Sequence, residues 1–210
     1  MTGDENGKQE FLDLYSVPRE TLRNLELFEA ELIEENRRQN LIARSTEAEF
    51  WTRHLLDSAQ LTEHIPPHAK TCLDVGSGAG LPGIVLATIT NAAYTLVEPR
   101  RLRVEFLLRV ASKLSLTDRV EILCAKIEKI TRRQFDVITA RAFASLSNTL
   151  KATRHLAQPE TVWLLPKGRS AEAEIAEAKN IWNAHFETLP SKTSAEGHIV
   201  RVSHFQGMRT

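Results

Sequence analysis

One stretch near residue 75 combines a carboxylate with closely spaced glycines, a pattern suited to binding a nucleotide-sized ligand. A short apolar run over residues 71–75 is followed by a glycine-rich turn, and residues 81–87 have the composition of a helix start. Glycines allow the backbone to bend sharply and a ligand to lie against it, which a Cβ atom would block. Strand, glycine turn and helix form the first unit of a nucleotide-binding α/β fold. The acid and the turn glycines are Asp74, Gly76, Gly78 and Gly80.

The glycines fit two templates. Gly78, Gly80 and Gly83 spell G-x-G-x-x-G, the dinucleotide fingerprint, whereas the segment 74–80 resembles the first motif of class I S-adenosylmethionine (AdoMet) methyltransferases. A carboxylate at Asp74 can face the cationic amino-acid end of AdoMet, but it would repel a pyrophosphate. The acid therefore favours a methyltransferase. A dinucleotide enzyme and a tight turn without a ligand remain alternatives.

Further polar residues follow the other predicted strands, where ligands sit in such folds. Glu98 is placed to accept hydrogen bonds from a ribose, which AdoMet and NAD share. Ile127 and Glu128 can enclose an adenine and bond its amino group. Arg141 emerges at the mouth of the pocket, beside the reactive methyl group, and Lys167 offers a second cationic contact.

Strands and helices alternate after residue 68, which predicts a mostly parallel sheet with helices on both faces. The final two strands, near 184–189 and 198–205, are expected to add an antiparallel edge. Residues 1–68 are predicted to form an N-terminal helical extension and residues 69–210 one compact domain. Within the extension, residues 1–9 are expected to lack regular structure, and Thr46-x-x-Glu49 is interpreted as a capping box that begins a helix.

Composition sets the broad class. The 210 residues are 42% hydrophobic, and no apolar run approaches the roughly 20 residues of a membrane span. Neither a signal-peptide core nor a metal-binding Cys/His cluster is present in the sequence, so a cytoplasmic protein without metal is expected. Cys72 and Cys124 are interpreted as buried strand residues in a reducing compartment.

Charge is distributed unevenly although the net charge is zero. Residues 1–60 hold 7 Lys and Arg against 13 Asp and Glu, while residues 100–170 hold 15 against 6. Such segregation favours a basic face for a polyanion. The residues expected to contact the phosphates of such a polyanion are Arg100, Arg101, Arg103 and Lys167.

Several strings together resemble the bacterial small-subunit rRNA guanine-N7 methyltransferases, the RsmG or GidB family. The resemblance covers about residues 27–169. The matching strings are Asn40-Leu41, Arg53-His-Leu-Leu-Asp-Ser58, Asp74-Val-Gly-Ser-Gly-Ala-Gly-Leu-Pro-Gly83, Arg141-Ala-Phe-Ala-Ser-Leu146 and Lys167-Gly168. It implies the class I AdoMet-methyltransferase (Rossmann-like) fold.

The resemblance also implies a cofactor, a substrate and site residues. The cofactor would be AdoMet and the substrate 16S rRNA, as free RNA, small subunit or assembly intermediate. The family binds AdoMet at positions that fall on Gly76, Leu81, Ile127, Glu128 and Arg141. This chain has Glu98-Pro99-Arg100-Arg101 where the family often has Asp-Ser, and Leu102-Arg103 in place of a Lys-Arg pair. A carboxylate is kept, while the altered basic residues change the predicted RNA contacts.

The implied reaction needs no general base, because guanine N7 has a free lone pair and no proton to lose. Catalysis would then rest on positioning and electrostatics, and we assign no catalytic side chain. N7 lies in the deep major groove of A-form RNA, so the target guanine is expected in a loop or displaced from its stack. The nearest titrating candidate, His54, is interpreted as a packing residue.

Two other functions remain open from the residues alone. A nicotinamide-dependent oxidoreductase would need a proton-transfer residue, and none stands out. A non-catalytic ribosome-assembly factor would not need the intact glycines and Glu98. A monomer is expected.

Overall fold

A seven-stranded sheet forms the centre of the computed structural model, which describes residues 4–209. Its strand order is β3-β2-β1-β4-β5-β7-β6, and β7 runs antiparallel to both of its neighbours. The strands are β1 (Thr71–Val75), β2 (Ala93–Val97), β3 (Val120–Leu123), β4 (Phe135–Thr139), β5 (Ala157–Lys167), β6 (Trp182–Pro190) and β7 (His198–Met208). The predicted mostly parallel sheet with an antiparallel strand near one edge is confirmed.

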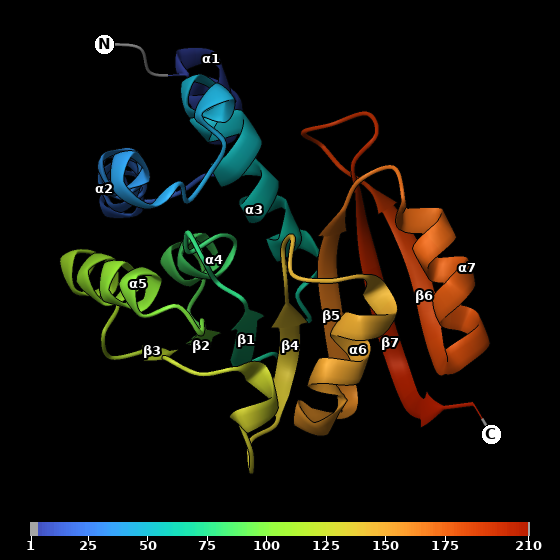
Figure 1. Cartoon of the computed structure of the whole chain (residues 1–210). Coiled ribbons are helices and arrows are strands. Elements are labelled where there is room, and N and C mark those ends of the chain that lie inside the picture. The colour runs from blue at the N-terminus through green and yellow to red at the C-terminus, as the bar shows by residue number, and fades with distance from the viewer. Residues whose placement is uncertain (1–3, 210) are drawn as a thin grey trace.

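Helices cover both faces of this sheet (Figure 1). On one face lie α4 (Gly83–Ile89) and α5 (Arg101–Lys113), whose apolar residues pack with Cys72 and Leu96. On the other lie α6 (Leu146–Thr153) and α7 (Ala171–Ile181), which pack on Leu73 and Trp163. Successive strand residues point to opposite faces, so alternate apolar positions build the two cores.

The N-terminal extension packs on α4 and α5 (Figure 1). It contains α1 (Glu5–Leu14), α2 (Arg19–Gln39) and α3 (Asp57–Ala59), together with the 3-10 segments Arg44–Glu49 and Gln60–His64 and the π-helical turn Trp51–Leu56. Phe28 and Phe50 belong to the same apolar cluster as Ile84 and Leu107 of the α/β part. The boundary at residue 68 stays a prediction, because the extension and the sheet share this core.

Two expectations for the extension are wrong. Residues 5–9 belong to α1, whose first turn is capped by Asp4 Oδ1 accepting from Gly7 N at 2.9 Å; residues 1–3 lie outside the described part of the chain. Thr46 does not cap a helix: its hydroxyl donates to Ala43 O at 2.7 Å and also meets His54 Nε2. The capping-box hydroxyl is therefore already engaged, and the chain continues as a 3-10 segment.

Cys124 also differs from the prediction. Cys72 is buried in β1, but Cys124 is exposed. The pairing of β3 with β2 ends at Leu123, so Cys124 lies in the loop beyond the strand.

Within residues 4–209 none of the helices combines the length and apolar character that a membrane crossing requires. The same residues include no group of three or more His, Cys, Asp or Glu side chains arranged to hold a metal ion.

Candidate functional site

The glycine turn between β1 and α4 takes a conformation that other residues resist. Gly76, Gly78 and Gly80 have φ values of +68°, +51° and +85°. A Cβ on Gly76 would lie 2.9 Å from the Phe143 ring, and one on Gly80 would lie 2.8 Å from Ile84. The turn needs glycine both for its left-handed backbone and for close approach to neighbouring side chains.

Glu98 fastens this turn to the end of β2. Its side chain is only 3% exposed, and Oε2 accepts a hydrogen bond from Gly78 N at 3.0 Å. Oε1 accepts from Arg100 N at 2.8 Å, and Arg103 Nη1 lies 3.9 Å from Oε2. A carboxylate can accept about four hydrogen bonds, so Glu98 retains capacity for ribose hydroxyls.

A cavity of about 260 Å³ opens beside the turn, and we call it the β1–β3 cavity. It is formed by the carboxyl ends of the first three strands and by the ring of Phe143. Its lining residues are Val75, Gly76, Val97, Pro99, Ala125, Lys126, Ile127, Glu128 and Phe143. Three predicted cofactor residues, Gly76, Ile127 and Glu128, therefore lie together. Apolar walls with one carboxylate suit an adenine ring and its amino group.

Asp74 lies beneath the turn and lines neither this cavity nor the larger one described next. It is fully buried, and Oδ1 accepts from Thr139 Oγ1 at 2.9 Å. A Cβ on Gly83 would lie 2.7 Å from Oδ2, so the carboxylate sits against the start of α4. Burial raises the pKa of Asp74 to about 6. Leu81, which is also buried, packs into the core cluster with Ile84.

A second, larger cavity of about 510 Å³ lies on the other side of the loop that follows β4. We call it the β4–β7 cavity, since that loop, the end of β5, the β6–β7 hairpin and the extension all contribute to it. Arg141 and Ala142 line it, whereas the next residue, Phe143, lines the β1–β3 cavity. Ala142 has φ +51°, and this left-handed residue lies where the loop passes from one cavity to the other. One short loop therefore separates the two cavities.

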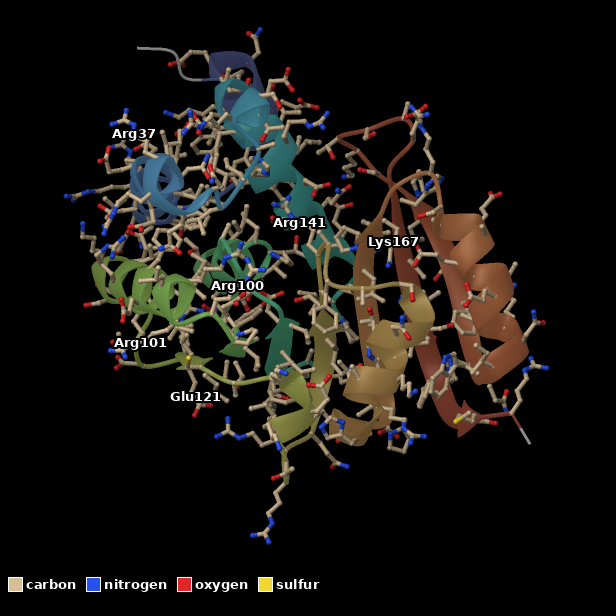
Figure 2. All side chains as sticks on the ribbon, in the orientation of Figure 1. Arg37, Arg100, Arg101, Glu121, Arg141 and Lys167 are labelled. Atoms are coloured by element: carbon tan, nitrogen blue, oxygen red, sulfur yellow. The ribbon has the colours of Figure 1, made fainter. Side chains whose placement is uncertain are left out.

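Arg141 is held by the extension (Figure 2). Its Nη1 lies 3.3 Å from Asp57 Oδ2 and 3.5 Å from Arg53 O, and its Nη2 lies 3.3 Å from His54 Nδ1. About one fifth of each side chain in the Arg141–Asp57 pair is exposed, 21% and 20%. All three contacts are long, so the guanidinium can still donate to a ligand.

His54 is held neutral in this cluster. Because a guanidinium can only donate, Nδ1 accepts from Arg141, and Nε2 carries the proton and donates to Thr46 Oγ1 at 2.8 Å. Burial, reinforced by the charges of Arg141 and Arg53, lowers the pKa of His54 to about 3. The ring also packs against Phe50, with centroids 5.4 Å apart. These contacts support the interpretation of His54 as a packing residue.

The predicted RNA-binding residues occupy two places. Arg100 and Arg101 are exposed at the start of α5 (Figure 2). Together with Arg103 and with Arg38 of α2, they border a shallow cavity of about 460 Å³. Arg103 turns toward Glu98 and the glycine turn. Lys167 lines the β4–β7 cavity, but its Nζ already donates to Ala144 O at 2.7 Å and to Glu174 Oε2 at 2.9 Å.

Sequence reasoning gave no role to several residues that line the cavities. Asp57 and Phe143 lie inside the strings 53–58 and 141–146 that resemble the family. The resemblance therefore included both residues but did not predict which cavities they line. Thr193 of the β6–β7 hairpin carried no motif at all.

The strand order and the position of both cavities define a class I methyltransferase fold. Solved structures with this fold include a TehB-like SAM-dependent methyltransferase from Corynebacterium glutamicum, with a TM-score of 0.57 at 12% identity over 83% of this chain and 98% of that one. A methyltransferase from Geobacter sulfurreducens has a TM-score of 0.57 at 14% identity, over 84% of this chain and 87% of that one.

The particular family follows from sequence. The family described as "GidB: rRNA small subunit methyltransferase G" matches residues 21–200. A ribosomal RNA small subunit methyltransferase G from Rhizorhabdus wittichii is 42% identical over 90% of this chain and 88% of its own length. The protein of the same name from Zymomonas mobilis is 41% identical over 90% and 88%. This chain therefore belongs to the GidB family, and neither the oxidoreductase nor the non-catalytic alternative gains support from these relatives.

Proposed function

We propose that this protein transfers a methyl group from AdoMet to N7 of a guanine in 16S rRNA of the small ribosomal subunit. The observation that carries the proposal is the pair of cavities on either side of the loop 141–143. A methyl transfer needs the donor and the acceptor side by side, and one loop borders both sites. Membership of a family named for small-subunit rRNA methylation supports the substrate.

The residues of the β1–β3 cavity fit AdoMet. Gly76 has no Cβ, which would lie against Phe143, and Ile127 and Glu128 can enclose the adenine. Glu98 does not line the cavity itself, but it bonds the adjacent glycine turn and can accept ribose hydroxyls from there. Arg141, at the junction of the cavities, can bind the carboxylate of the methionine moiety. When bound, AdoMet supplies an electrophilic methyl group on a sulfonium.

The protein's part in the reaction is alignment rather than proton transfer. Guanine N7 attacks with its own lone pair, the bond from sulfur to methyl carbon breaks, and no proton moves. His54, which contacts Arg141 at the junction, is neutral and hydrogen-bonded through both ring nitrogens, so it offers no free base. Rate enhancement then comes from holding N7 in line with the methyl group.

RNA binding is proposed to use the exposed arginines at the start of α5. Arg100, Arg101 and Arg38 border one shallow cavity, where their guanidinium groups can meet backbone phosphates. Free rRNA, the small subunit and an assembly intermediate are all compatible with such contacts. We also propose that the protein acts as a monomer in the cytoplasm, where bacterial ribosomes are assembled and modified.

The test is mass mapping of methylated guanosines in 16S rRNA from cells with and without this protein. We expect one 7-methylguanosine to disappear from the deletion strain and to return with the wild-type gene. Purified protein should also bind AdoMet and not NAD by titration calorimetry. Identical methylation in both strains, or binding of NAD without AdoMet, would contradict the proposal.

A further inference from the structure

A single carboxylate lies in the otherwise basic β4–β7 cavity. Among the described residues that line this cavity, Asp57 is the only acidic one, and Arg53, Arg141 and Lys167 are the other charged side chains. Positive charge is what an RNA backbone requires, whereas a carboxylate repels phosphate. The presence of Asp57 therefore calls for a ligand group that donates hydrogen bonds.

Asp57 is held from three directions. Oδ1 accepts from Gln60 Nε2 at 3.0 Å and from Thr193 Oγ1 of the β6–β7 hairpin at 3.0 Å. Oδ2 meets only Arg141 Nη1, at the long distance of 3.3 Å. Oδ1 is saturated by these partners, while Oδ2 retains a free lone pair. The carboxylate is thus already oriented, which lowers the entropy cost of binding a ligand there.

We infer that Asp57 recognises the target guanine through Oδ2, which accepts one three-centre hydrogen bond shared by the N1–H and 2-amino groups of the base. The inference rests on the proposed function and names the residue that selects the base. A displaced base is read along its Watson–Crick edge. Guanine is the RNA base that presents two adjacent donors there, and the single open oxygen, Oδ2, can face both of them. With that edge at Asp57, N7 lies on the far side of the purine.

The same contact contributes to rate as well as to base choice. As the carbon–nitrogen bond to N7 forms and the carbon–sulfur bond breaks, the electron pair stays on sulfur and the purine becomes cationic. The N1–H of a cationic purine is a stronger donor, so its hydrogen bond to Asp57 tightens toward the transition state. An interaction that is stronger in the transition state than in the ground state accelerates the chemical step.

The decisive variant is Asp57→Asn, which keeps the size of the side chain and removes the charge. We expect kcat/KM for 16S rRNA to fall roughly 10- to 100-fold, the range for losing a hydrogen bond to a charged group. The affinity for S-adenosylhomocysteine, measured by calorimetry, should stay within about twofold, because the Asn carbonyl can still accept from Arg141 Nη1 and Arg141 keeps its contacts to Arg53 O and His54 Nδ1.

Base recognition is measured separately by NMR titration of the S-adenosylhomocysteine-loaded protein with 5′-GMP and 5′-IMP. IMP lacks the 2-amino group, so the wild type should bind GMP about 5- to 10-fold more tightly. The Asp57→Asn variant should bind the two nucleotides with similar affinity. This titration needs no methyl transfer, so it tests the inference even where methylation of 16S rRNA is absent and the proposed function fails.

Gln60→Met is the matched control for the structural role of Asp57. Gln60 does not line the cavity, yet it donates to Asp57 Oδ1 and accepts from Lys192 N of the hairpin at 2.8 Å. This variant should keep the preference for GMP and lose less than about threefold in kcat/KM. A loss equal to that of Asp57→Asn would assign the effect to a loosened hairpin and overturn the inference. A wild-type GMP preference in Asp57→Asn, or weakened S-adenosylhomocysteine binding, would overturn it as well.

Discussion

The two cavities are built in different ways. The β1–β3 cavity is lined by strand ends and loops within residues 75–128, with Phe143 as the one later addition. The β4–β7 cavity is lined by segments as far apart as Leu41 and His198, drawn from the extension, the sheet and the hairpin. The first is thus a local product of one α/β unit, whereas the second exists only once distant parts of the chain have packed together.

The buried ionisable groups near the two cavities have pKa values shifted in opposite directions. Beneath the glycine turn, burial raises the pKa of Asp74 to about 6. At the β4–β7 cavity, burial and neighbouring arginines lower the pKa of His54 to about 3. Each shift disfavours the charged form, so the two regions respond to acid in opposite directions.

The largest expected effect comes from a substitution that disrupts the β1–β3 cavity and leaves the β4–β7 cavity intact. Gly78→Val places a β-branched residue at φ +51° and adds bulk beside Gly76 O and Glu98, which distorts the turn, so AdoMet affinity should fall by at least about 100-fold. Gly168→Ala is the control, because nothing lies within 4 Å of its added Cβ, and its AdoMet affinity should match the wild type. Titration calorimetry measures both, with circular dichroism to verify folding. Tight AdoMet binding by Gly78→Val would show that the turn does not form the cofactor site.

The opposite effects of Asp74 and His54 on stability at low pH can be separated by a second variant. At pH 5 the neutral His54 should cost the native state about 2 kcal/mol, since pH 5 lies about 1.5 units below its unfolded pKa. The free energy of unfolding is therefore unaffected by His54 above pH 6.5 and decreases as the pH falls from 6.5 toward 3. Asp74 acts in the other sense: its raised pKa means that stability increases as pH falls from 7 toward 4.

The His54→Gln variant should therefore isolate the contribution of Asp74. We expect the wild type to be nearly as stable at pH 5 as at pH 7, and the variant to be more stable at pH 5 by about 1–2 kcal/mol. Urea unfolding at the two pH values measures the difference. Parallel pH profiles for wild type and variant would rule out the depressed pKa of His54.

Glu98→Gln tests with a smaller expected effect whether the two cavities bind their ligands independently. The amide keeps the shape of the side chain but loses the charge that accepts ribose hydroxyls, so AdoMet affinity should fall roughly 10-fold. The affinity for GMP should not change, because Glu98 does not line the β4–β7 cavity. Equal losses for AdoMet and GMP would mean that the two cavities act as one site.

The basic surface at the start of α5 tests RNA docking apart from both cavities. Replacing Arg100 and Arg101 by Ser should flatten the salt dependence of RNA binding by about 0.7–0.9 per lost phosphate contact and leave AdoMet affinity unchanged. Arg103 is kept, since it lies against Glu98. Arg132 and Arg133, which precede β4 at the amino-terminal end of that strand, give the control double substitution. A larger change in the salt dependence for the control variant would show that RNA docks at Arg132 and Arg133 instead.

The smallest expected effect is the pH dependence of the methyl-transfer step. The single-turnover rate should vary by less than about twofold from pH 6 to 8.5, because N7 needs no base and His54 stays neutral throughout. A rate that climbs tenfold per pH unit, and loses that climb in His54→Ala, would place His54 in the catalytic set.

Most of the fold was predictable because local patterns carried it. The apolar run over residues 71–75 marked β1, and the final strands expected near 184–189 and 198–205 correspond to β6 and β7. Residues 44–64 were predicted less well. The Thr46 hydroxyl bonds to Ala43 O and His54 Nε2, and not to the backbone N–H groups at the start of a helix. Thr46 lies only three residues from Ala43 and eight from His54, and such local side-chain hydrogen bonds compete with a helix cap without changing the residue spacing.

The sequence by itself determined the β1–β3 cavity, because parallel strands bring their carboxyl ends to one edge whatever surrounds them. Gly76, Ile127 and Glu128 of its lining could therefore be placed from their positions after strands. Tertiary structure alone decided that Asp57, Arg141 and Thr193 meet, at sequence separations of 84 and 136 residues from Asp57. Such contacts depend on how the extension and the hairpin close over the sheet, and no local periodicity encodes a contact between segments that distant.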